Sequence, residues 1–490
     1  MEEKGTKKER KKLTKSNTGY AITGFLDAAA YDFIGEFGLF FLTSIVRLPS
    51  GIAGAILSFA NIVTAILSPI VGYVSDRNPA KMGKRRSFIL FGGIAAIIAL
   101  PFMLIPLPLD GGVKVFFYGA VVLIFFIGYT FYSVPYLAYG ADISTEYDER
   151  SDLLTLKTIV ENIGTASAYV LSTSAIALFM GLGMTEHISW FVAVLIICGI
   201  SLICLLIGFV MTRGHDAPAE KNEKINILKF IKDMLIAYAS AMKLKTLRIM
   251  ILIILFAMIG YTIKTNGEMF MLTYCCNLSA GAVAFYFLIS TGIISVIRPI
   301  PTNWFLRAFG KKGGFMICVG LYVVSALYFL MTGIDSLGDA IIYGIFNGFI
   351  LDGYWQIIPA MVYDIADVDM YFYKKERKGT LVSFQALVEG IGGGVGTLIS
   401  GLFLAFYHFN EDAAWEAEEM GTVAEQSQHA VDGVLYLSTI VPAVFFAISA
   451  LLVLLFPINK RRHGRLLEAI DKGVRAEDND PEYDDLKILN

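Results

Sequence analysis

Residues 71–88 read VGYVSDRNPAKMGKRRSF. The stretch contains five Lys or Arg residues, one Asp, one Pro and two Gly, and the residues on either side of it are mostly apolar. Each flanking run is long enough to cross a bilayer, which takes roughly 20 residues of helix. A basic turn between two such runs is typical of a loop on the cytoplasmic side of a membrane. The stretch therefore predicts two transmembrane helices joined by a cytoplasmic turn.

The composition of the whole chain agrees with a protein that lies in a lipid bilayer. Of 490 residues, 56% are hydrophobic and 17% are charged, and the mean hydropathy is +0.63. Soluble domains carry about 25% charged residues, so water is not the expected solvent. The formal net charge of −3 gives no sign of a nucleic-acid partner. The five Cys residues lie in or beside apolar segments without metal-ligand spacing, which favours packing and no metal cofactor.

Apolar runs along the chain predict an all-α membrane protein with twelve transmembrane helices in two halves of six. The domains are a tail (1–19), an N-terminal half (20–212), a linker (213–246), a C-terminal half (247–457) and a second tail (458–490). The predicted spans are 20–46, 51–75, 87–108, 115–140, 156–181, 188–212, 247–274, 280–305, 313–334, 338–362, 380–407 and 433–457.

The distribution of Lys and Arg predicts the orientation. Most of the 40 Lys and Arg residues fall in the two tails and in the loops on the same side, and the loop 408–432 on the opposite side has none. This bias follows the positive-inside rule when both termini are cytoplasmic. We expect a multi-pass protein of the plasma membrane.

A weak internal repeat supports two equivalent halves. RLPSGIAGAILSF (47–59) and NLSAGAVAFYFLI (277–289) follow the first helix of each half, and the basic turn at 71–88 has a counterpart in NWFLRAFGKKGGF (303–315). Between the halves, INILKFIKDMLIAYASAM (225–242) has apolar residues at helical spacing, with Lys between them. It predicts an amphipathic helix on the membrane surface.

Three stretches resemble the major facilitator superfamily, in particular its glycoside–pentoside–hexuronide:cation symporter branch, typified by the melibiose permease. They are GYVSDRNPAKMGKRR (72–86), YSVPYLAYGADISTEYDERSDLLTLK (132–157) and GYWQIIPAMVYDIADVDMYFYKKERKGTLVSFQALVEG (353–390). The resemblance implies a secondary active transporter that moves a sugar, glycoside or similar polar solute with a coupling cation by alternating access. We expect a monomer without a cofactor.

Charges inside the predicted spans are the candidate functional residues, because a charge in a bilayer is costly and usually lines a cavity. Residues assigned to solute binding are Asp27, Tyr31, Asp32, Lys264, Trp355 and Gln385; those assigned to ion coupling are Asp32, Glu36, Glu268 and Glu389. The resemblance implies that Trp355 and Gln385 occupy pocket positions. The alternative is that these charges form ion pairs that only hold helices together.

Departures from the branch bear on the coupling ion. By the resemblance, sodium-coupled members carry aspartates where this chain has Thr64, Ser68 and Ser133. Hydroxyl groups can ligate sodium but bring no negative charge. We therefore expect proton coupling, with Glu36 and Glu268 as the first choices for the proton carrier. Sodium coupling and a lipid-like solute remain the alternatives.

Charges at the cytoplasmic helix ends are candidates for gating. Asp76, Arg77, Arg85 and Arg86 can form pairs that make and break between two states, and Arg298 within span 280–305 is assigned to the same gating. The alternative for the basic cluster is that it only fixes topology. The five His residues lie in loops or near span ends and no nucleophile motif occurs, so we expect no enzyme. A membrane sensor is the least favoured reading.

Overall fold

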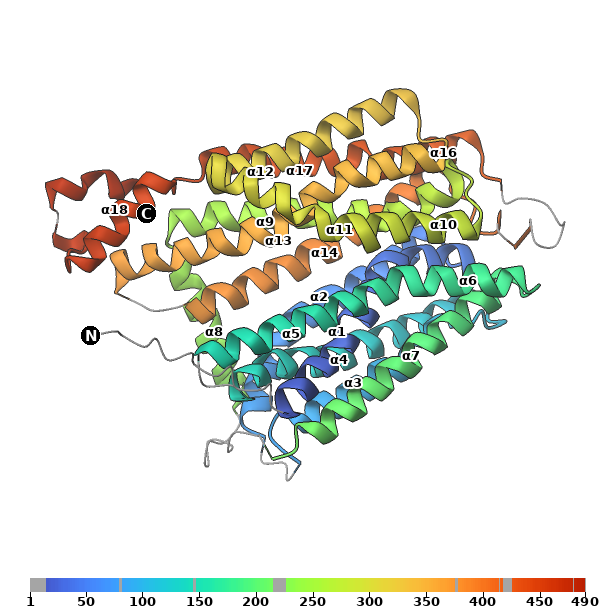
Figure 1. Cartoon of the computed structure of the whole chain (residues 1–490), viewed down its shortest axis with the longest axis horizontal. Helices are drawn as coiled ribbons and strands as arrows, with labels where there is room; N and C mark the ends of the chain where they lie inside the picture. Colours follow the sequence, from blue (N-terminus) through green and yellow to red (C-terminus); the bar gives the residue numbers. More distant parts are fainter. Residues whose placement is uncertain are drawn as a thin grey trace, which may run out of the picture.

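The computed structural model describes residues 15–78, 82–143, 147–214, 226–374, 378–413, 415–416, 425–478 and 480–489. Its long helices form two groups that lie side by side (Figure 1). The first group contains α1 (Lys15–Phe40) with a π-helical turn η1 (Phe41–Ile45), α2 (Ser50–Asp76), α3 (Arg86–Met103), α4 (Gly111–Ile143), α5 (Tyr147–Ala166), η2 (Ser167–Leu171), α6 (Ser172–Gly181) and α7 (Glu186–Met211).

The second group follows a separate helix, α8 (Ile227–Ala241). It contains α9 (Lys245–Phe270), η3 (Met271–Cys275), α10 (Ala280–Phe287), η4 (Leu288–Ile294), α11 (Ser295–Ile297), α12 (Pro299–Thr332), α13 (Leu337–Tyr373), α14 (Lys378–Phe406), α16 (Gln428–Ser438) and α17 (Ile440–Leu455). The chain ends with α18 (Lys460–Asp471) and two 3₁₀ segments, η5 (Ala476–Asp478) and η6 (Pro481–Leu489).

The predicted all-helical membrane fold is confirmed. Nine helices or helix runs of the described residues are long and apolar enough to cross a membrane. One of them, Ala280–Thr332, contains two predicted spans and bends at Gly310, whose φ of 71° departs from helical geometry. The nine do not include α1 and α13, both of which carry several carboxylates. The count of twelve and the domain boundaries stay predictions.

Two predicted boundaries lie inside longer helices. The first helix begins at Lys15, within the predicted tail, and α13 continues to Tyr373, beyond the predicted end at 362. The extra turns of α13 carry Asp364, whose carboxylate accepts a hydrogen bond from Lys311 Nζ at 2.7 Å. The contact with Lys311 stabilises the Asp364 carboxylate within the helix. From the sequence alone, Asp364 was expected to lie in the loop after the span.

The backbone repeats between the halves as the sequence predicts. Arg47 and Asn277 both adopt the left-handed conformation, with φ of 60° and 48°. Each lies shortly after a π-helical turn, η1 or η3, and shortly before a helix, α2 or α10. Residues other than Gly rarely have positive φ. Its occurrence at matching positions of the two repeat segments therefore indicates the same local fold.

The two halves meet most closely along α2 and α14. A Cβ on Gly54 would lie 2.9 Å from the Gly401 Cα, and one on Gly394 would lie 2.7 Å from the Ile62 side chain. Small residues allow helices to approach closely in a membrane. The contact runs from Gly54 at the start of α2, opposite Gly401 near the end of α14, to the middle of both helices. We call this end of the bundle the loop end.

Aromatic side chains add to the contact between the halves. The rings of Phe37 and Phe287 are 5.6 Å apart, and those of Phe40 and Phe270 are 5.1 Å apart. All four belong to the buried core. Edge-on aromatic pairs of this kind add to the free energy of burial. They close the interior on the side of the loop end.

At the opposite end, which we call the linker end, α8 and α18 lie outside the two groups (Figure 1). The predicted amphipathic helix is confirmed as α8. It contacts both halves, because Phe230 stacks on Tyr73 of α2 at 4.2 Å and Tyr238 stacks on Phe384 of α14 at 4.6 Å. Its Leu228 is 82% exposed, and its place on the membrane surface stays a prediction.

The described part of the C-terminal segment, residues 458–478 and 480–489, folds against the C-terminal half. Leu466 of α18 and Leu486 of η6 are buried in the same apolar cluster as residues of α9, α13 and α17. His463 Nε2 contacts an oxygen of Asp367 in α13 at 2.9 Å. These residues of the predicted tail therefore pack at the linker end.

Candidate functional site

The first polar cluster lies midway along α1. Asp27 Oδ1 accepts a hydrogen bond of 2.9 Å from the Tyr129 hydroxyl, and Asp32 Oδ2 accepts one of 2.6 Å from Thr165 Oγ1. The ring of Tyr31 stacks on Tyr129 at 5.0 Å. Helices α4 and α5 thus supply the donors that hold both predicted carboxylates.

The second cluster lies midway along α13 and α14. Glu389 Oε1 accepts hydrogen bonds from the Tyr354 hydroxyl at 2.8 Å and from Gln385 Nε2 at 2.9 Å. Trp355 is 51% exposed and its ring meets Tyr261 of α9 edge-on at 6.1 Å. An exposed indole beside amide and carboxylate groups offers a flat apolar surface next to hydrogen-bonding partners.

The third cluster joins the two halves. Lys264 Nζ donates to Glu268 Oε2, and the Tyr286 hydroxyl donates to Glu268 Oε1. Glu36 of α1 also lies within electrostatic range of Glu268 and Lys264 of α9. Two neighbouring carboxyl groups can share a hydrogen bond when one of them is protonated.

The three clusters face each other between the halves. Tyr31 of α1 lies within electrostatic range of Glu389 of α14, and Tyr261 of α9 lies within range of Asp32 and Glu36. Tyr31 is 40% exposed, although it lies deep along its helix. The residues predicted for solute binding and ion coupling therefore come together from both halves at mid-depth, where transporters with this repeat bind their solutes.

The residues predicted for gating form contacts within the N-terminal half. Arg85 Nη2 pairs with Asp76 at 2.6 Å, and Arg85 Nη1 donates to the Ala138 carbonyl at 2.6 Å. Arg86 is buried and stacks on the Phe209 ring, with 4.2 Å from the guanidinium carbon to the ring centroid. The basic turn at the linker end thus fastens α2 and α3 to α4 and α7.

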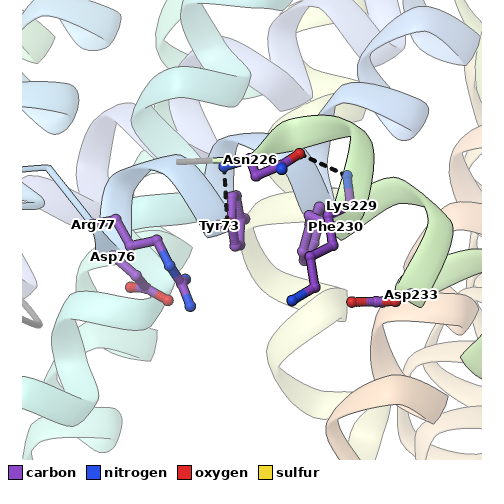
Figure 2. A pocket seen from close by; sticks show the side chains of 7 residues that line it. All are labelled: Tyr73, Asp76, Arg77, Asn226, Lys229, Phe230 and Asp233. Atoms are coloured by element: carbon purple, nitrogen blue, oxygen red, sulfur yellow. Dashed lines mark hydrogen bonds between the residues drawn. The ribbon is translucent and has the colours of Figure 1, made fainter. Parts of the chain in front are cut away.

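Arg77 lies beside a cleft of about 690 Å³ at the linker end. Its guanidinium lies over the Tyr73 ring at 4.2 Å. Figure 2 shows the residues that line this cleft: Tyr73, Asp76, Arg77, Asn226, Lys229, Phe230 and Asp233. Cations and carboxylates are equal in number here, and the cleft lies apart from the three clusters at mid-depth.

Arg298 pairs with a residue of its own half. Its Nε donates to Asp352 Oδ2 at 2.6 Å, and both side chains are largely buried. A Cβ on Gly348 would lie 1.6 Å from the guanidinium, so Gly348 leaves the space that Arg298 occupies. The pair links the segment after η4 to α13 and does not cross between the halves.

The loop after α14 binds the opposite half at the loop end. Arg47 Nη1 contacts Asp412 at 3.2 Å, and the Ser50 amide donates to Glu411 at 2.7 Å. Trp415 donates from Nε1 to the Ile45 carbonyl at 2.9 Å, and its ring lies between Arg47 and His187 at 4.3 and 4.8 Å. These contacts hold the loop end closed.

Several of these residues escape a reading of the sequence. Tyr129, Thr165 and Tyr286 carry no charge, and nothing in the sequence distinguishes these two Tyr residues among the 24 in the chain.

Two of the three hydroxyl groups considered as sodium ligands bond to their own helix. Thr64 Oγ1 donates to the Ala60 carbonyl at 2.9 Å, and Ser68 Oγ donates to the Thr64 carbonyl at 2.7 Å.

Comparison with known proteins gives the family. A family model described as MFS/sugar transport protein matches residues 19–460. The isoprimeverose transporter of Lactiplantibacillus pentosus is 22% identical over 448 residues, which cover 90% of this chain and 88% of the relative. The sodium-dependent lysophosphatidylcholine symporter 1 of Xenopus tropicalis is 22% identical over 513 residues, with 96% and 91% covered.

A solved structure gives the fold independently. The crystal structure of the nucleoside transporter NupG superposes with a TM-score of 0.61 at 14% sequence identity, and the match covers 90% of this chain and 98% of that one. The resemblance to the major facilitator superfamily is thereby confirmed, and so is the prediction of a transporter and not an enzyme. Because the family model matches residues 19–460, nearly the whole chain, the chain belongs to the MFS/sugar transport protein family.

Proposed function

We propose that this protein moves a sugar or glycoside across the plasma membrane together with a proton, with both termini in the cytoplasm. The observation that carries the coupling is that two buried carboxyl groups from opposite halves, Glu36 and Glu268, lie within electrostatic range of each other, where they can share one proton. Solute and proton would share the space between the three clusters. The relative that transports isoprimeverose supports a sugar as the solute.

The proton shared by the two carboxyl groups acts on the equilibrium between two states. With a proton, the two carboxyl groups attract and hold α1 to α9; without it, two negative charges meet at close range. Two like charges 4 Å apart repel by about 4 kcal/mol at an effective dielectric constant of 20, and Lys264 offsets only part of this. Loss of the proton therefore favours separation of the halves near the loop end.

A transport cycle follows from this two-state behaviour. Proton and solute bind while the loop end is open, and the proton shared by Glu36 and Glu268 then favours its closure. The structure has the loop end closed by α2 with α14 and by the contacts of Trp415. Release of the proton and the solute at the linker end restores the repulsion between the two carboxylates. This repulsion returns the transporter to the state in which the loop end is open.

The solute site is assigned to the exposed aromatic side chains and their polar neighbours. Trp355 and Tyr31 offer ring faces to the C–H groups of a sugar, because both are partly exposed and lie beside tyrosines of the mid-depth clusters. Asp27, Asp32 and Gln385 are placed to accept from or donate to its hydroxyl groups. A solute held this way contacts both halves.

Two alternatives have specific support. Similarity to a sodium-dependent lysophosphatidylcholine symporter favours a lipid-like solute and sodium coupling. Against sodium, the Thr64 and Ser68 hydroxyls bond to carbonyls of their own helix and bring no charge. Both alternatives are distinguishable by the same assay.

The test is uptake by the purified protein in proteoliposomes. Radiolabelled isoprimeverose and lysophosphatidylcholine are offered separately under an imposed pH gradient or an imposed sodium gradient. We expect accumulation of the sugar with the pH gradient alone. In Glu36→Gln, accumulation should be lost while counterflow of the same sugar continues, since exchange needs the solute site but not the proton. Accumulation driven by sodium alone and indifferent to pH would refute proton coupling.

A further inference from the structure

Hydrogen-bond donors are distributed unequally over the pair of carboxyl groups. Glu268 accepts from Lys264 Nζ at one oxygen and from the Tyr286 hydroxyl at the other. Glu36 is 2% exposed, and its Oε1 is buried with no hydrogen-bond partner among the described residues. Both donors of the cluster therefore converge on Glu268.

This asymmetry favours one location of the proton. Hydrogen bonds donated to a carboxylate stabilise its charged form, and those that involve a charged partner are the stronger ones. Glu268 has two such donors, one of them the Lys264 ammonium. A buried carboxyl group without donors, such as Glu36, is far less costly when neutral. The neutral acid can then donate its proton to the Glu268 carboxylate.

The position of Tyr286 is fixed by packing in the C-terminal half. The side chain is 1% exposed, and a Cβ on Gly344 of α13 would lie 2.7 Å from its hydroxyl oxygen. Gly344 thus leaves the space in which the hydroxyl reaches Glu268. The arrangement joins α9, α10 and α13.

We propose that Tyr286 is a positioning residue that, with Lys264, holds the negative charge on Glu268, so that Glu36 carries the transported proton. This assignment rests on the proposed proton coupling and specifies which carboxyl group carries the proton. The titratable groups around Glu36 are Asp32 on its own helix, Tyr169 of η2, Tyr261, Lys264 and Glu268 of α9, and Tyr286 of α10.

Proton release is a single deprotonation of Glu36. The O–H bond of Glu36 breaks, its electron pair remains on the Glu36 carboxylate, and the proton passes to water. Two carboxylates then share the one ammonium of Lys264. Tyr286 keeps donating to Glu268 throughout, so the charge that appears on release appears on Glu36.

Infrared difference spectroscopy of the full-length protein in liposomes tests the assignment without a solute. The C=O stretching band of a protonated carboxyl group is followed as pH is raised. Asp27, Asp32 and Glu389 of the neighbouring clusters contribute signals of their own, so the assignment is read from the change that each variant makes. We expect one component of the wild-type band to be absent in Glu36→Gln and present in Glu268→Gln. Since Glu268→Gln leaves Lys264 without its carboxylate, the double variant Lys264→Gln/Glu268→Gln serves where the single variant does not fold.

Tyr286→Phe tests the positioning role, because it removes one hydroxyl and little else. A hydrogen bond to a charged group is worth about one pH unit of titration midpoint. In the Glu36→Gln background, where Glu268 is the remaining carboxyl group of the pair, we expect Tyr286→Phe to move the acidic onset of Glu268 protonation to higher pH by about that amount, since the anion on Glu268 is less stabilised. Tyr118→Phe is the matched control: that buried hydroxyl donates to the Ile105 carbonyl in the other half, and in the same background it should leave this onset unchanged.

The outcomes separate the two proposals. A band component that survives in Glu36→Gln and vanishes in Glu268→Gln, or an equal onset of Glu268 protonation in Glu36→Gln with and without Tyr286→Phe, overturns the assignment while proton-driven uptake still stands. A wild type that shows no titrating carboxyl band and no accumulation under a pH gradient overturns the proposed coupling, and the assignment with it.

Discussion

Single side chains at mid-depth carry the most direct prediction about the solute. Trp355→Ala should weaken sugar binding about tenfold, because removal of a stacked aromatic ring costs about 1–3 kcal/mol in comparable stacking sites. Its indole is half exposed, so removal should leave the free energy of unfolding nearly unchanged. The affinity for isoprimeverose is measured by isothermal titration calorimetry.

Trp304→Ala is the control for this change. Trp304 is also exposed but lies on α12, next to Phe305 and Phe309, away from the three clusters. Its loss should leave sugar affinity within twofold of the wild type. If both Trp variants bound the sugar equally well, Trp355 would not belong to the solute site.

Charged residues and neutral ones differed in how well the sequence predicted them. Asp32, Glu36 and Glu268 could be singled out because a charge inside an apolar run is costly and rare. The partners that orient them, Thr165 and Tyr286, carry no such signal. Their positions depend on which helices pack together, and this is decided by contacts between residues far apart in the chain.

The helix pair α2 and α14 offers a test at the scale of elements. In Gly54→Ala, the added methyl group would lie 2.9 Å from both the Gly401 Cα and the Thr397 carbonyl oxygen, so the two helices must move apart. We expect the closed loop end to be destabilised. A thiol reagent that cannot cross the membrane should then label a Cys introduced at Phe37 several times faster.

Gly51→Ala on the same helix is the matched control. There the nearest atoms to the new methyl group are side-chain carbons of Leu402 and Ala405 at 3.6 and 3.7 Å, which is ordinary contact. Labelling should match that of the parent protein. Equal rates in the Gly54 and Gly51 variants would show that the α2–α14 contact does not control closure.

Elements were easier to predict than their ends. Apolar length identified the helices, and the repeat at 47–59 and 277–289 reappeared as matching left-handed residues. The bend at Gly310 and the extension of α13 past Asp364 could not be predicted, because each depends on a tertiary contact or on one backbone angle. The loop 408–432 was likewise expected only as a loop without Lys or Arg, whereas its Glu411 and Asp412 bind the N-terminal half.

At the scale of the whole molecule, the excess of Lys and Arg at the linker end predicts the orientation. A Cys introduced at Gly421, in the loop that lacks Lys and Arg, should react in intact cells with a reagent that cannot cross the membrane. A Cys introduced at Leu228 of α8 should react only after permeabilisation. The reverse pattern would refute cytoplasmic termini.

The central claim is that a proton shared by Glu36 and Glu268 holds the loop end closed. The most direct test is the distance between spin labels at Val113 of α4 and Met331 of α12, two exposed positions at the loop end of opposite halves. Pulsed electron paramagnetic resonance would measure it across a pH series in liposomes, with the five native Cys residues replaced. The account predicts one short distance at acid pH, a growing longer population as pH rises, and, in Glu36→Gln, a distribution weighted to the short distance that does not change with pH. A distribution that ignores pH and responds to sodium instead would contradict it.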